Sequence, residues 1–172
     1  MACSDYRWRT ALDTFCRVGL GMATWDALLV PGGVYLVSYP ASLPRNYRVG
    51  SRMLEFLLEQ HRPRRLVLVA HEGCARYRAG LRLPPGHSLA ARQQQDVGKV
   101  ARWAAERYPG LAVEGYYAAG DPASGGTFTP VTALMPAAAA EVTAAPEPRV
   151  APAPAIPEPA DQTSLPPAEP PS

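Results

Sequence analysis

The start of the chain places three chemically active residue types close together. Cys3, Asp5 and Arg7 form the pattern Cys-x-Asp-x-Arg. A thiolate can bind a metal ion, and an arginine beside a carboxylate keeps that carboxylate ionised and oriented. Two further metal-binding types, His71 and Cys74, follow much later in the sequence HEGC. These residues form a candidate site only if the fold brings the two segments together.

The chemistry of such a site follows from the residue types. Two thiolates and an imidazole are a standard ligand set for Zn²⁺, and three protein ligands leave the fourth position for water, as in catalytic zinc sites. Zinc lowers the pKa of bound water from 15.7 towards about 7, which gives a hydroxide nucleophile near neutral pH.

The segment before His71 indicates the element that positions the second pair. The run from Leu66 to Ala70 is apolar and rich in β-branched residues, which is typical of a central parallel strand covered on both faces. His71 and Cys74 then lie at the carboxyl end of this strand. If the first residues form a neighbouring strand, Cys3 lies at the same edge, where α/β sheets bind ligands.

Further elements flank this strand. We expect helices over residues 10–20, 48–62 and 88–108, the last with Ser88 as its N-cap. We expect strands over 26–39, 111–119 and 126–131. The first of these is broken by Pro31-Gly32-Gly33, and the last is an antiparallel edge strand. The middle helix carries apolar residues at helical spacing, namely Val49, Met53, Phe56 and Leu57, followed by Gln60. Alternating strands and helices predict an α/β fold with a mostly parallel central sheet flanked by helices.

The composition changes sharply near the end of the chain. From Pro136 onwards Pro and Ala occupy most positions and no aromatic residue occurs. This segment has too little bulky apolar surface to offset the entropy cost of ordering. We therefore predict a folded domain over residues 1–135 and a disordered tail over 136–172.

Charge and cysteine content argue against a nucleic-acid-binding protein and against a disulfide-stabilised one. The net charge is only +2, and Lys99 is the single lysine among scattered arginines, so no nucleic-acid footprint is expected. There is no leader pattern and no apolar run near eighteen residues, so we expect no membrane partner and a cytoplasmic location. Three cysteines in a reducing compartment favour metal binding or burial over disulfides. Cys16, inside an apolar helical pattern, is expected in the core.

The two motifs together resemble those of the β-class carbonic anhydrases, whose hallmark is Cys-x-Asp-x-Arg followed later by His-x-x-Cys. In this chain the matching residues are Cys3, Asp5, Arg7, His71 and Cys74. The segment LLVPGGV is also similar to a family strand that ends in Ala-Gly-Gly, so the resemblance spans about residues 3 to 131. It implies a zinc ion held by Cys3, His71 and Cys74, and a homodimer or higher homo-oligomer.

The resemblance further implies a lyase that reversibly hydrates carbon dioxide to bicarbonate through a zinc-bound hydroxide. Asp5 would accept the hydrogen bond of the hydroxide, and Arg7 would keep Asp5 ionised and oriented. If Arg7 released Asp5, the Asp5 carboxylate would occupy the fourth zinc position. The resemblance implies this closed form, because the family is known to adopt it. Tyr77 and His87 are candidates for removing the proton by sequence proximity alone.

Two alternatives stay open. The same site could instead hydrolyse carbonyl sulfide or carbon disulfide. Enzymes for these substrates use the same nucleophile and differ in the walls and entrance of the pocket. The chain could instead be a catalytically inactive zinc-binding scaffold protein. Two features favour this second alternative: only Met1 and Ala2 precede Cys3 where the family has a full strand, and Leu29-Val30 replace the family's Arg-Asn.

Overall fold

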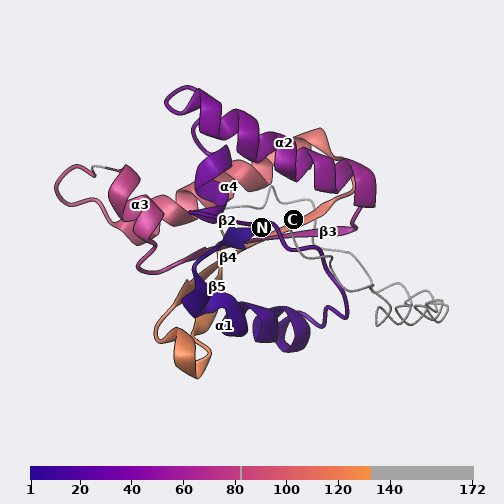
Figure 1. Ribbon diagram of the computed structural model, residues 1–172, viewed down its shortest axis with the longest axis horizontal. Coiled ribbons are helices and arrows are strands. Elements are labelled where there is room, and N and C mark those ends of the chain that lie inside the picture. The colour runs from indigo at the N-terminus through magenta and orange to yellow at the C-terminus, as the bar shows by residue number, and fades with distance from the viewer. Residues whose placement is uncertain (82, 133–172) are drawn as a thin grey trace, which may run out of the picture. The chain divides into compact units, whose positions relative to one another are not determined.

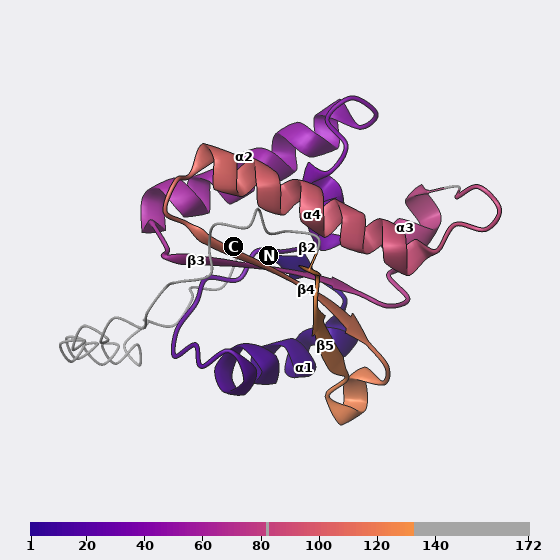
Figure 2. The same ribbon diagram turned by 180° about the vertical axis from the view of Figure 1, so that it is seen from behind.

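The computed structural model describes residues 1–81 and 83–132, and these residues form an α/β fold. Helices α2 (Pro44–His61) and α4 (Leu89–Arg107) cover one face of the sheet, and α1 (Arg9–Thr14) covers the other (Figures 1 and 2). The tail predicted over 136–172 lies outside the described residues. None of the described helices is long and apolar enough to cross a lipid bilayer.

The sheet is mostly parallel, as expected. Strand β3 (Arg65–His71) pairs in parallel with β4 (Ala112–Ala119), and β5 (Thr127–Pro130) joins β4 antiparallel at the edge. On the other side, β1 (Ala2–Cys3) pairs in parallel with β2 (Leu29–Val30). The Val69 N–H donates to the Met1 carbonyl at 3.0 Å, which places β1 beside β3. The hydrogen-bonded ladders thus form a two-stranded sheet, β1-β2, and a three-stranded sheet, β3-β4-β5, which lie side by side in the order β2-β1-β3-β4-β5.

Strand β3 is buried on both faces, which confirms its prediction as a central strand. Leu66, Leu68 and Ala70 pack in the core beneath α2 and α4, together with residues of those helices. Val67 and Val69 point to the opposite face and pack with residues around α1. The continuous apolar run therefore reflects two cores that share one strand.

The strand predicted over residues 26–39 is mostly wrong. Only Leu29–Val30 is extended, and Gly33–Val37 forms a 3-10 helix, η3. The cause is the turn between them, where Gly32 and Gly33 adopt φ values of +82° and +54°. A Cβ atom at Gly33 would lie 2.9 Å from the main chain of Ala2 and Cys3. Glycine therefore lets this turn pack directly against β1.

Helix α2 buries a different face from the one that its apolar spacing indicates. The buried residues are Gly50, Ser51, Leu54 and Leu58. Gly50 lies so close to the neighbouring helix that an added Cβ would come within 2.7 Å of the Leu36 side chain. Small residues thus let α2 approach η3 closely. The apolar residues Val49, Met53 and Phe56 stay 58%, 41% and 60% exposed.

The other helices agree with the expected positions in outline. α1 is followed by a π-helical turn, Phe15–Gly19, in which Cys16 is buried as expected. Ser88 caps α4 by accepting a hydrogen bond from the Ala91 N–H at 3.3 Å. The short helix α3 (Ala75–Gly80), which follows Cys74, was not predicted.

Candidate metal centre

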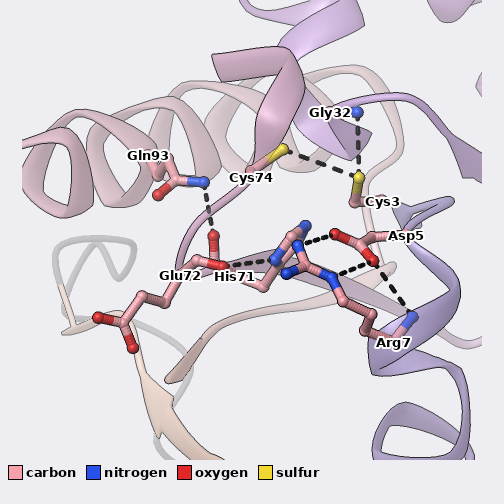
Figure 3. Close-up of polar contacts among 8 residues, drawn as sticks. All are labelled: Cys3, Asp5, Arg7, Gly32, His71, Glu72, Cys74 and Gln93. Carbon is pink, nitrogen blue, oxygen red and sulfur yellow. Dashed lines mark hydrogen bonds and ion pairs between the residues drawn. The ribbon is translucent and has the colours of Figure 1, made fainter. Parts of the chain in front are cut away.

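Cys3, His71 and Cys74 come together at the carboxyl edge of the parallel strands (Figure 3). Their ligand atoms all lie within 4.8 Å of one another, and the two sulfur atoms are 3.8 Å apart. Two sulfurs bound to one tetrahedral zinc, each at 2.3 Å, would be separated by about 3.8 Å. The cysteine pair thus has the spacing that a shared zinc ion requires.

The local structure explains why these residues converge. Cys3 ends β1 and His71 ends β3, and the two strands are neighbours. Beyond His71 the chain turns at Gly73, whose φ is +69°, and Cys74 occupies the N-cap of α3. The turn brings Cys74 back over the strand end towards Cys3.

The histidine presents the correct nitrogen to a metal. His71 Nδ1 lies 2.8 Å from the main-chain carbonyl of Glu72, which can only accept, so the neutral ring carries its proton on Nδ1 and presents Nε2 as the acceptor. Nε2 is buried and has no hydrogen-bond partner among the described residues. A buried acceptor without a partner is costly, and a metal ion would satisfy it. Together with the two sulfur atoms, this free nitrogen makes a ligand set that fits zinc.

The two thiols interact strongly. The hydrogen bond with Cys74 lowers the pKa of Cys3 to about 4, and the Gly32 N–H, 3.2 Å from the Cys3 sulfur, also favours the thiolate. The same thiol contact, together with burial, raises the pKa of Cys74. The pair therefore holds one negative charge readily, which attracts a cation.

Asp5 and Arg7 form a bidentate ion pair beside the cluster. Arg7 Nε donates to Asp5 Oδ1 at 2.9 Å, and Arg7 Nη2 donates to Oδ2 at 2.6 Å. The Arg7 main-chain N–H adds a third hydrogen bond, to Oδ1, at 3.1 Å. These contacts with Arg7 lower the pKa of Asp5 to about 2. Asp5 is therefore an ionised acceptor at neutral pH, held by Arg7.

Helix α4 supports the segment that carries His71 and Cys74. Gln93, which is 1% exposed, donates from Nε2 to the His71 carbonyl at 2.8 Å (Figure 3). One turn later, the fully buried Asp96 accepts hydrogen bonds from Tyr77 of α3 at 3.2 Å and from Tyr39 at 2.6 Å. Gln93 thus holds the segment that carries the ligands at His71, and Asp96 holds it at Tyr77, just beyond Cys74. The sequence signal for them is a polar residue at a core position of an amphipathic helix.

The candidate proton carriers differ in their surroundings. The Tyr77 hydroxyl donates to Asp96 in the core, and burial strongly raises the pKa of Tyr77. This arrangement argues against proton transfer from Tyr77 to solvent. His87 is exposed in the loop before α4, with its Nδ1 3.3 Å from the Pro85 carbonyl.

A cavity of about 160 Å³ opens beside Cys3 and Asp5. Its other lining residues are Ser4, Tyr6, Trp8, Arg9, Leu12 and Leu29. A second cavity, of about 10 Å³, shares Cys3, Trp8 and Leu12 with the first and is also lined by His71 and Phe128. The Trp8 and His71 rings lie 5.7 Å apart, so the indole forms a wall of the site. The space next to the ligands is small and mainly apolar.

The architecture has a counterpart among solved structures. It is similar to the β-carbonic anhydrase CafA of the fungal pathogen Aspergillus fumigatus, with a TM-score of 0.50 and 17% sequence identity. The match covers 78% of this chain and 74% of that one. The chain shares its fold with a β-carbonic anhydrase. No protein-family model and no curated protein matches the sequence. The carbonic anhydrase fold thus agrees with the resemblance that the two motifs indicate.

Proposed function

We propose that the chain is a zinc-dependent lyase that reversibly hydrates carbon dioxide to bicarbonate. The observation that carries the proposal is the placement of an ionised, arginine-bound Asp5 beside the cluster of Cys3, His71 and Cys74. The shared fold with a β-carbonic anhydrase supports the same interpretation.

The residues have separate tasks in this proposal. Cys3, Cys74 and the Nε2 atom of His71 would hold the zinc ion. When bound, zinc supplies an acidified water molecule as the nucleophile. Asp5 would accept a hydrogen bond from that water and so orient it towards the substrate. Arg7 keeps Asp5 ionised and turned towards itself, so that Asp5 does not become a fourth ligand.

The cavity suits a small uncharged substrate. Its volume of about 160 Å³ admits only a small molecule, and Trp8, Leu12 and Leu29 give it an apolar wall beside the polar residues Ser4, Asp5, Tyr6 and Arg9. Carbon dioxide is small and apolar overall, and it can lie against these side chains next to the nucleophile. The sulfur analogues use the same nucleophile, but no feature of the cavity favours them.

The ion pair between Asp5 and Arg7 favours an enzyme over an inactive scaffold. A structural zinc site requires a closed set of four ligands and no oriented acceptor beside them. In this chain three ligands converge and the nearby carboxylate is bound by Arg7 through both oxygens. The test is stopped-flow measurement of carbon dioxide hydration by the zinc-loaded protein. Activity supports the proposal, and a zinc-loaded protein without activity contradicts it.

A further inference from the structure

The cavity beside Cys3 and Asp5 has an apolar wall and a polar rim. The wall consists of buried or partly buried side chains, namely Trp8, Leu12 and Leu29. The rim consists of exposed residues whose side chains can all donate hydrogen bonds, namely Ser4, Tyr6 and Arg9. The wall suits an uncharged molecule, whereas the rim suits an anion.

Arg9 brings a positive charge to this rim that no other residue offsets. It is exposed at the start of α1, two positions beyond the last residue of the Cys-x-Asp-x-Arg motif. Arg9 makes no ion pair within residues 1–81 and 83–132. Asp5, the carboxylate among the lining residues, is bound by Arg7 through both of its oxygens. The Arg9 charge is therefore available to a ligand in the cavity.

The other charges near the cavity largely cancel. Two thiolates, from Cys3 and Cys74, offset the charge of a zinc ion held between them. Arg7 offsets Asp5 in the same way. The product of the proposed reaction, however, is an anion. The motif residues thus supply no net positive charge to bind bicarbonate, and Arg9 supplies it.

We propose that Arg9 binds bicarbonate at the rim of the cavity. The inference rests on the proposed function, because bicarbonate is the product of that reaction. A guanidinium group presents a planar fork of N–H donors, which matches two oxygens of a carboxylate-like anion. Carbon dioxide carries no charge and gains no comparable attraction. Arg9 thus determines affinity for the anion and does not activate the nucleophile.

The exposure of Arg9 limits the size of the effect. Ion pairs that face solvent are weak and are screened by salt. Removal of the Arg9 charge should therefore weaken bicarbonate binding by about three- to tenfold, and by less at high ionic strength.

The first test measures binding without turnover. Cobalt(II) replaces zinc, which has no visible spectrum, and the absorption of the cobalt-loaded full chain is followed as bicarbonate is added at constant ionic strength. Arg9→Gln should raise the dissociation constant by about three- to tenfold. Arg9→Lys keeps the charge and should stay within about threefold of wild type, since only the fork geometry is lost.

Arg52→Gln is the matched control. Arg52 is also exposed and makes no ion pair within the described residues, but it lies on α2, on the opposite face of the sheet from α1 (Figures 1 and 2). It does not line the cavity. Arg52→Gln changes the net charge as Arg9→Gln does, and it should bind bicarbonate like wild type.

The second test uses bicarbonate as an inhibitor of carbon dioxide hydration by the zinc-loaded chain. Its inhibition constant should rise in Arg9→Gln by the same factor as the dissociation constant. A chain that binds bicarbonate through Arg9 but does not hydrate carbon dioxide would contradict the proposed function and support this inference. The two results are therefore separable.

Several results of the cobalt titration would overturn the inference. One is a wild-type chain whose spectrum does not respond to bicarbonate. Another is Arg9→Gln with wild-type affinity. A third is an equal loss in Arg9→Gln and Arg52→Gln, because the net charge of the protein alone would then explain it. A fourth is Arg9→Lys that binds as weakly as Arg9→Gln, because the charge would then not be the cause.

Discussion

The sulfur atoms of Cys3 and Cys74 lie 3.8 Å apart, although 71 positions separate the two residues in the chain. The contact joins the end of β1 to the N-terminus of α3, so the site exists only in the folded protein. A metal ion bound to both sulfurs binds the native state and not the unfolded chain. Zinc binding is therefore expected to raise the free energy of unfolding.

Removal of one ligand should remove the metal. Purified wild type is expected to carry about one zinc per chain, and Cys74→Ser should lose most of it because two ligands remain. Cys16→Ser is the matched control, since Cys16 is buried but lies outside the ligand cluster. Elemental analysis of the three proteins measures this. A wild-type zinc content in Cys74→Ser, or no zinc in wild type, would contradict the proposed zinc site.

Gln93 should influence zinc affinity without touching the metal. Gln93→Leu removes the hydrogen bond to the His71 carbonyl and frees the strand end that presents the imidazole. We expect zinc affinity to fall by about 10- to 100-fold, as for other residues that orient metal ligands. Gln95→Leu, on the exposed side of the same helix, should leave affinity unchanged. Competition with a zinc chelator measures both. Equal affinities for the two variants would show that Gln93 does not position His71.

Asp96 should matter for stability. Asp96→Asn removes the carboxylate shared by the buried Tyr77 hydroxyl, the partly buried Tyr39 hydroxyl and the Lys99 ammonium. We expect a loss of about 2 to 3 kcal/mol in the free energy of unfolding. The exposed Asp13, paired with Arg17, is the control, and Asp13→Asn should cost less than about 0.5 kcal/mol. Urea denaturation of both variants gives the comparison, and equal losses would contradict the expectation.

The Asp5 carboxylate should be needed for rate and not for metal binding. Asp5→Asn should keep zinc but lower carbon dioxide hydration by about ten- to a hundredfold, because an amide is a weaker acceptor than an ionised carboxylate. Arg7→Ala should lower the rate as well, since it frees Asp5 to approach the metal. Stopped-flow rates on zinc-loaded variants measure both effects. Wild-type rates in Asp5→Asn would exclude the proposed role of Asp5.

Much of the site could be predicted because its residues carry strong local signals. The apolar run before His71 marks a buried strand, and a strand end followed by Gly73 gives the turn that returns Cys74. The pairing of Asp5 with Arg7 needs only two residues of separation. Spacing and residue type were sufficient for these features.

Other features depend on contacts that a single sequence does not contain. Gly32 and Gly33 can end a strand or begin a helical turn, and the close approach of Gly33 to β1 decides between them. In α2 the apolar residues and the small residues lie on different faces. The close packing of Gly50 against Leu36 determines which face is buried. Gln93 was missed because its partner, the His71 carbonyl, is a main-chain atom.

The most direct test of the proposed function is carbon dioxide hydration by the zinc-loaded wild-type chain. The rate is followed by stopped flow with an indicator dye above about pH 8, where the nucleophilic form of the water predominates. We expect hydration in proportion to protein concentration, and loss of that rate in Cys74→Ser. A wild-type protein with its full zinc content that leaves the uncatalysed rate unchanged would contradict the account.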